Sequence, residues 1–248
     1  MKQFAIFIFI SMCFYYNVNA QEEKCKPSLN ISADFVSSYI WRGLPGFGMQ
    51  AGTSFLAPCI QPSLIFGNDK FEIGTWGSVN LEGSYMETDF FASYSFSGFS
   101  FFLTDYFAFS DNLEADLFDC NKDSTAHIVE ASIEWCGEKI PLHILAATMI
   151  FGNDKEADPE RSNNYSTYFE LGYNLKVKEN DLDIFLGCTP GNGYYNSYDG
   201  TESLQVVNLG LTGNRTIQIN DKLELPVSVS FITNPHLQRA FFVFKATL

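Results

Sequence analysis

After its first 20 residues the chain lacks any long helical pattern of apolar residues, and it is poor in basic residues. Lysine and arginine together number 15 against 29 aspartate and glutamate residues, which gives a formal net charge of −14. Nucleic acid needs basic partners for its phosphates, so this acidic balance excludes nucleic acid as a partner.

Cysteine is also scarce. The chain has six cysteines, one of them at position 13, and the other five are widely spaced without a C-x-x-C pair. This spacing predicts neither a zinc site nor a dense disulfide framework. The topology derived below permits two disulfides, Cys59 with Cys120 and Cys25 with Cys136, and leaves Cys188 single.

The N-terminal segment "MKQFAIFIFISMCFYYNVNA" has one lysine, an apolar run too short to span a bilayer, and small residues at Val18 and Ala20. This pattern predicts a signal peptide over residues 1–20. A lipoprotein anchor on Cys13 is the alternative, and it fits less well because Met12 precedes that cysteine. Residues 21–28 would then form a short periplasmic segment, followed by one domain over 29–248.

The rest of the chain alternates apolar and polar residues with period two, as a strand does when its two faces meet different media. The pattern predicts an all-β fold of about twelve strands, each near the ~9–11 residues that a tilted strand needs to cross a bilayer. The expected strands cover residues 29–42, 59–66, 71–79, 85–96, 99–109, 125–136, 140–151, 164–176, 182–190, 204–219, 223–233 and 237–248.

The connections between these strands alternate in length. Short turns such as "SG" at 97–98 and "NDK" at 220–222 alternate with long connections at 43–58, 110–124, 152–163 and 191–203. Connections three and eleven are short exceptions. Short turns at one end and long loops at the other are typical of a single antiparallel outer-membrane β-barrel. A β-sandwich, the alternative, has no reason to sort its loops in this way.

The first expected strand separates into two faces. Its predicted lipid face holds Ile31, Ala33, Phe35, Tyr39 and Trp41, and its predicted lumen face holds Asn30, Ser32, Asp34, Ser38 and Arg42. The chain ends in another two-faced stretch, "RAFFVFKATL". Such a terminal amphipathic strand resembles the recognition signal of outer-membrane barrels, although Leu248 stands where that signal usually has an aromatic residue.

Two stretches carry a resemblance to a known family. "SSYIWRG" and, further on, "FEIGTWGS" are similar to the S-x-Y-x-x-R-G and G-x-W-x-S stretches of the TorF-type porin family, the first in a slightly shifted form. The matching residues are Ser38, Tyr39, Arg42, Gly43, Gly74, Trp76 and Ser78. The resemblance covers about the first third of the chain after residue 20. It implies an outer-membrane barrel with a channel role and supplies no catalytic residues.

Arg42 is expected on the lumen face at the loop end of the first strand. Barrel closure would place it beside the last strand, whose Arg239 lies on the polar face at the same end. These arginines either pair with acids or attract an anionic solute, and pairing is favoured because an unpaired charge in a narrow space is costly. Asp34, Glu72 and Glu87 are the expected partners. The candidate lumen or rim residues are Arg42, Arg239, Asp34, Ser38, Glu72, Glu87, Asp89, Glu130 and Glu170.

A mainly acidic lumen favours cations, and about twelve strands enclose a narrower space than a ~16-stranded porin does. We therefore predict a narrow porin for small polar solutes, set in the lipid of a Gram-negative outer membrane. The alternative is a closed barrel that binds or anchors through its long acidic loops. An outer-membrane hydrolase is the third possibility. His127, His143 and His236 have no Asp or Ser at a suggestive register, so we predict no enzymatic activity, metal site or cofactor.

Overall fold

The computed structural model describes residues 26–46, 57–109, 116–137, 139–156 and 162–248. In this part of the chain, twelve strands form one closed antiparallel barrel, and two further short strands pair only with each other. The predicted fold class is therefore confirmed. No helix among the described residues has the length and apolar character needed to span a membrane. The expected signal peptide, residues 1–20, and residues 21–25 of the expected periplasmic segment lie outside the described residues.

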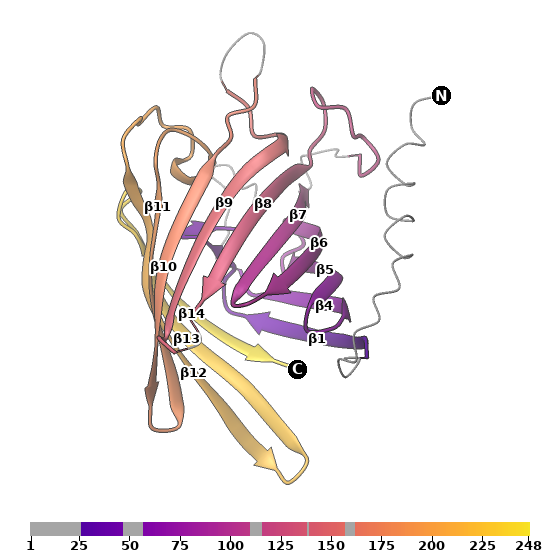
Figure 1. The fold of residues 1–248 in the computed structure, drawn as a ribbon, viewed down its shortest axis with the longest axis vertical. Helices are drawn as coiled ribbons and strands as arrows, with labels where there is room; N and C mark the ends of the chain where they lie inside the picture. The colour runs from indigo at the N-terminus through magenta and orange to yellow at the C-terminus, as the bar shows by residue number, and fades with distance from the viewer. Residues whose placement is uncertain (1–25, 47–56, 110–115, 138, 157–161) are drawn as a thin grey trace.

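Around the barrel the strand order is β1-β14-β13-β12-β11-β10-β9-β8-β7-β6-β5-β4, so nearly every strand pairs with its neighbours in sequence (Figure 1). The barrel strands are β1 (Ser28–Val36), β4 (Cys59–Gly67), β5 (Phe71–Asn80), β6 (Met86–Phe96), β7 (Phe99–Phe109), β8 (Ile128–Cys136), β9 (Leu142–Gly152), β10 (Thr167–Val177), β11 (Asn180–Thr189), β12 (Gln205–Asn220), β13 (Leu223–Asn234) and β14 (Arg239–Thr247).

The two faces of the wall differ in chemistry, as the alternation predicts. The outward face carries large apolar side chains in the open, such as Leu64 of β4, Phe90 of β6, Leu171 of β10 and Phe231 of β13. Residues between these positions point inward, and many are small and polar. Three inward pairs bond across neighbouring strands: Ser32 with Ser63, Ser95 with Ser100, and Thr212 with Ser230.

The ends of the barrel also differ. At one end, here called the turn end, the strands are joined by tight turns such as Ser97–Gly98, where both residues have positive φ and link β6 to β7. At the other, the loop end, long connections follow β1, β7, β9 and β11. At the turn end, β12 and β13 extend past their neighbours: β11 pairs with β12 only as far as Asn214, and β14 with β13 only as far as Val227 (Figure 1).

The barrel closes at the seam between the first and last strands. β1 and β14 are paired from Asp34 with Thr247 to Val36 with Lys245, and Ala33 exchanges two backbone hydrogen bonds with Leu248. On the lumen side, Asp34 accepts a hydrogen bond of 2.6 Å from Thr247 Oγ1, and the ammonium group of Lys245 lies 3.2 Å from its other oxygen. Asp34 therefore stabilises the closure rather than pairing with Arg42.

Two sequence-based predictions about the strands and the cysteines are wrong. The first strand ends at Val36 and not at residue 42, because the chain bends away from the wall at Ser37–Ser38. The second error concerns the cysteines. The four in the described residues, Cys59, Cys120, Cys136 and Cys188, are all free thiols, and Cys25 lies outside this part of the chain. Spacing along a chain cannot show whether two thiols come within bonding distance.

Candidate functional site

The segment Ser37–Gly46 folds into the lumen at the loop end, and we call it the plug. Its short strands β2 (Ile40–Trp41) and β3 (Leu44–Pro45) pair with each other and not with the barrel wall. The turn between them consists of Arg42 and Gly43, with φ values of 48° and 79°. Two successive left-handed residues make the tight hairpin turn that reverses the chain without splaying its strands.

Gly43 lies against the barrel wall. A Cβ atom at this position would be 2.0 Å from the carbonyl oxygen of Val207 in β12, so no side chain fits there. On another side, the Asn234 side-chain amide donates a hydrogen bond of 3.3 Å to the Gly43 carbonyl. Leu44 and Pro45 are buried. The tip of the plug is therefore packed inside the barrel.

Arg42 forms a two-pronged ion pair with Glu130 of β8. Its Nη1 donates to Glu130 Oε2 at 2.6 Å, and its Nη2 donates to Oε1 at 3.0 Å. The Arg42 side chain is 13% exposed and that of Glu130 only 1%. Charge-assisted hydrogen bonds of this geometry are among the stronger ones in proteins. Sequence analysis included both residues among the lumen candidates but expected Arg42 to pair with Asp34, Glu72 or Glu87.

Aromatic rings enclose the guanidinium group. The Cζ atom of Arg42 lies 4.6 Å from the centre of the Trp41 ring, 4.7 Å from that of Tyr168 and 5.6 Å from that of Tyr195. The Trp41 and Tyr195 rings are stacked, with their centres 5.6 Å apart. Rings at these distances attract a cation through their negative faces. We call Glu130, Tyr106, Tyr168 and Tyr195 the cation cage.

Glu130 is also held without Arg42. Tyr195 donates its hydroxyl to Glu130 Oε2 at 2.8 Å, and Tyr106 donates to Oε1 at 3.2 Å. Tyr106 belongs to the barrel wall, whereas Tyr195 lies in the single helical turn η1 (Tyr194–Asn196) within the connection after β11. Two connections from the loop end thus fold inward and meet at one carboxylate.

The position of η1 depends on the fully buried Asp154, which follows β9. Its carboxylate accepts hydrogen bonds from the backbone and side chain of Ser166 and from the hydroxyl of Tyr198. The Ser166 hydroxyl oxygen in turn accepts a bond from the Tyr194 amide at 2.8 Å. Burial raises the pKa of Tyr198, and the Asp154 charge raises it further, so this phenol stays protonated as a donor.

A second group of acids lies under the base of the plug. Glu87 of β6 accepts hydrogen bonds from the hydroxyls of Tyr85 and Tyr39, the latter at 3.5 Å. Asp89 is two residues along the same inward face, and both carboxylates are buried. In the described part of the chain, Asp89 Oδ1 and Ser38 Oγ have no hydrogen-bond partner.

Tyr39 and Trp41 were predicted to face lipid, and this prediction is wrong. The Tyr39 ring lies 5.3 Å from that of the inward-facing Trp76, and Trp41 packs on Tyr106 and Tyr195. Their apolar character matched the lipid face of a strand. Once the chain leaves the wall at Ser37, alternation no longer separates lipid from lumen.

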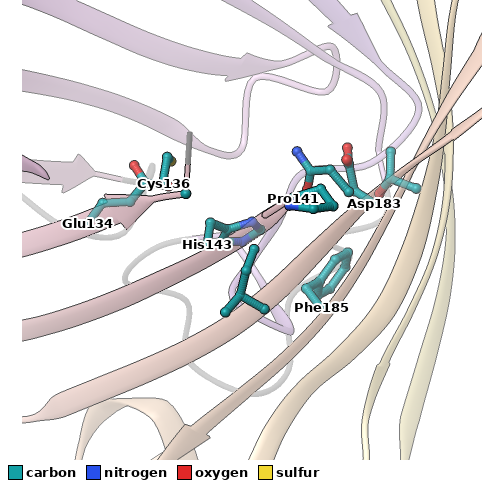
Figure 2. A pocket seen from close by; sticks show the side chains of 10 residues that line it. Glu134, Cys136, Pro141, His143, Asp183 and Phe185 are labelled. Atoms are coloured by element: carbon teal, nitrogen blue, oxygen red, sulfur yellow. The ribbon is translucent and has the colours of Figure 1, made fainter. Parts of the chain in front are cut away.

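Toward the turn end, a cavity of about 470 Å³ opens along the strands from β8 to β12 (Figure 2). Glu134, His143 and Asp183 contribute charged or titratable groups to its lining, and Phe185 contributes an aromatic ring. His143 Nε2 lies 3.6 Å from Glu170 Oε1, and the Asn214 amide donates to Asp183 at 2.7 Å. This half of the lumen contains an open cavity with several titratable groups in its lining, whereas the loop half is filled.

Two remaining candidates lie apart from the plug. Glu72 is on the inward face of β5 near the turn end, opposite Gly67. Arg239 is exposed at the loop end of β14, opposite Asn234. Glu170 of β10, by contrast, lies between the two halves of the lumen, where it accepts hydrogen bonds from Tyr168 and from Asn208.

Each of the three histidines has a carboxylate partner that the sequence pattern does not predict. His127 lies on the outward register before β8, with Nδ1 2.9 Å from both carboxylate oxygens of Asp105. His236 Nε2 lies 2.6 Å from Asp199 Oδ2 at the loop end. These partners come from neighbouring strands or loops, so spacing within one strand could not find them. Within the described residues, no cluster of three or more His, Cys, Asp or Glu residues is arranged to hold a metal ion.

Comparison with known proteins identifies no relative by sequence, since no family model and no curated protein matches the chain. One similar solved structure is described as "Unveiling the Mechanism Behind the in-meso Crystallization of Membrane Proteins". The match has a TM-score of 0.41 and 6% identity, and it covers 88% of this chain and 82% of the other.

Proposed function

We propose that this protein is a narrow outer-membrane channel of a Gram-negative bacterium, that it passes small polar solutes, and that the plug closes it at rest. Assignment to the TorF-type porin family is part of the same proposal, supported by the stretch "SSYIWRG", which lies within the plug. No catalytic role and no cofactor are included in the proposal.

The outer surface supports a membrane location. Large apolar side chains from all around the barrel are exposed there, including Leu64, Phe101, Leu186 and Phe244. Soluble proteins rarely expose a continuous apolar surface of this kind. A closed barrel also pairs the backbone hydrogen-bonding groups of neighbouring strands with each other and has no open sheet edge, which is what a strand needs in lipid.

The observation that carries the channel proposal is the way in which the plug is attached. Its two strands pair only with each other, and the barrel ladder is continuous without them. The ion pair between Arg42 and Glu130 and the surrounding aromatic packing hold it in the lumen. Displacing the plug would therefore break these contacts and leave the wall intact, which is the requirement for a gate.

The closed-barrel alternative also has an observation in its favour. Tyr39 and Leu44 of the plug are buried, and so are Glu130, Tyr168 and Tyr195 around Arg42, as residues of a protein core are. A plug of this kind could be permanent. The two functions differ in whether weakening the plug produces conductance.

Recordings of the purified full chain in planar bilayers separate them. We expect the wild type to open rarely and an Arg42→Gln variant to have an open probability higher by roughly tenfold or more, because the variant biases the equilibrium toward displacement of the plug. Arg239→Gln is the matched control, since Arg239 is an exposed arginine outside the plug. A folded Arg42→Gln variant as silent as the wild type would support a permanently closed barrel, and steady wild-type conductance would contradict closure by the plug.

A further inference from the structure

We infer that the cation cage around Glu130 is the solute site of the channel, and that it binds small organic cations carrying a guanidinium or ammonium group. This inference rests on the proposed channel function and adds the class of solute. In the resting state Arg42 occupies the cage as a tethered internal ligand. A free cation of the same chemistry would replace it when the plug is displaced.

The cage is built largely from residues outside the plug. Tyr106 and Tyr195 donate hydrogen bonds to the Glu130 carboxylate, and the Tyr168 ring lies 4.7 Å from the bound guanidinium carbon. Tyr168 is in turn held by a hydrogen bond of 2.9 Å from the Asn208 amide. None of these contacts needs Arg42. When the plug moves out, the site loses the Trp41 ring but keeps the Glu130 carboxylate, its two phenol donors and the Tyr168 ring.

The chemistry of the cage selects among cations. A buried carboxylate that presents both oxygens side by side matches the parallel N–H groups of guanidinium. Aromatic faces favour weakly hydrated organic cations over Na⁺, whose hydration shell they cannot replace. Anions are rejected because Glu130 would repel them. The fit is demonstrated by Arg42, whose guanidinium makes both bonds at 2.6 and 3.0 Å.

The lumen between the turn end and the cage is lined by acidic groups, so it carries negative charge as the cage does. Glu134 and Asp183 line the open cavity, and Glu170 lies on the inward face of β10 two residues below Tyr168. Glu72 faces the same lumen from β5, whereas the charge of Asp34 is paired with Lys245 at the seam. Acidic groups in a narrow passage raise the local concentration of cations and lower that of anions. A cation entering there meets successive carboxylates on its way to Glu130.

Tethering explains why the resting site is occupied by the plug. Arg42 is part of the chain, so its effective concentration at Glu130 is high and a free cation competes weakly until the plug is released. Removing the Arg42 side chain should leave an empty cage that accepts a free guanidinium ion. The probes are therefore guanidinium chloride at about 10 mM, far below denaturing concentrations, with sodium chloride and urea as salt and shape controls.

In the first experiment, thermal unfolding of the detergent-solubilised Arg42→Ala variant is followed with each probe. We expect guanidinium to raise its midpoint by roughly 3 °C, while sodium chloride and urea leave it unchanged. The shift should disappear in Arg42→Ala combined with Glu130→Gln, and it should be absent in Arg239→Ala. If Arg42→Ala does not fold, Arg42→Gly, which leaves more room, takes its place. Equal responses to guanidinium and sodium would overturn the inference.

In the second experiment, reversal potentials are measured on the Arg42→Gln channel with guanidinium on one side and sodium on the other. We expect guanidinium to be the more permeant ion, and Glu130→Gln in the same background to remove most of that preference. Conductance without a preference for guanidinium would contradict the proposed solute class but would support the proposed channel function. A thermal shift specific to guanidinium, without any conductance, would support the proposed cation site but contradict the proposed channel function.

Discussion

At the scale of single residues, the position of the plug depends on an ion pair whose two charges are almost completely removed from water. Arg42 is held by one carboxylate, the Tyr195 hydroxyl and three aromatic rings, and Glu130 by one guanidinium and two phenols. Two charges lose their hydration here, and only their mutual attraction and complete hydrogen bonding offset that loss. Removing one partner leaves the other charge buried, whereas removing both does not.

This asymmetry gives a prediction for the pair. Arg42→Leu and Glu130→Gln should each lower the free energy of unfolding by about 3 kcal/mol, since each leaves one buried charge without its partner. The double variant should lose clearly less than the sum of the two single losses. The free energy of unfolding is measured by urea unfolding in detergent micelles for the wild type, the two single variants and the double variant. Strict additivity would mean that the two side chains do not interact in solution.

At the scale of elements, the plug depends on one tight turn. Arg42 and Gly43 both have positive φ, and Gly43 also lies against the backbone of β12. A larger residue at position 43 is therefore disfavoured by its backbone conformation and by the lack of space for a Cβ atom. The barrel strands form a continuous ladder that does not include the plug. A change in the turn should therefore affect the plug far more than the wall.

Gly43→Ala tests this separation. The new Cβ would lie 2.0 Å from the Val207 carbonyl oxygen, so we expect the plug to move out and the open probability in bilayers to rise, while the barrel stays folded on unheated gels. Gly83→Ala is the matched control, because Gly83 has a similar φ of 73° and no atom within 4 Å of the added Cβ. A control variant that opens as often as Gly43→Ala would assign the effect to backbone strain in general.

At the scale of the whole molecule, the barrel combines an apolar outer face, a polar lumen that is open at the turn end, and a loop end filled by inward-folded segments. The wall closes through β1 and β14, where Asp34, Lys245 and Thr247 form the side-chain contacts of the seam. Such an arrangement satisfies the wall internally and leaves apolar side chains outside.

The expected behaviour of the intact protein follows from that outer face. The chain should fractionate with the outer membrane and migrate faster on gels without heating than after boiling, because a closed barrel unfolds only when its continuous ladder is broken. Fractionation of whole cells and paired heated and unheated lanes provide the measurement. Recovery as a soluble periplasmic protein would contradict the membrane location.

Period-two alternation in the sequence was sufficient to predict the barrel strands, their inward and outward residues, and the sorting of turns and loops. Phe99–Phe109 was predicted to the residue, and the other strands other than the first differ by at most three residues at either end. These properties are local, because the side chain of each residue in a strand points to the opposite face from that of its neighbour whatever the rest of the chain does. For the same reason the pattern predicts the wrong face for Tyr39 and Trp41, which lie outside the barrel strands.

The tertiary structure alone decided that Ser37–Gly46 leaves the wall, and that Arg42 pairs with Glu130 rather than with an acid closer to it in the sequence. The two residues are 88 positions apart, and they meet because barrel closure brings β8 opposite the plug while the turn at Gly43 directs Arg42 toward it. Each strand pattern records only which face is apolar. The identity of a partner across the lumen depends on curvature, closure and the path of a connection, which no single stretch of sequence contains.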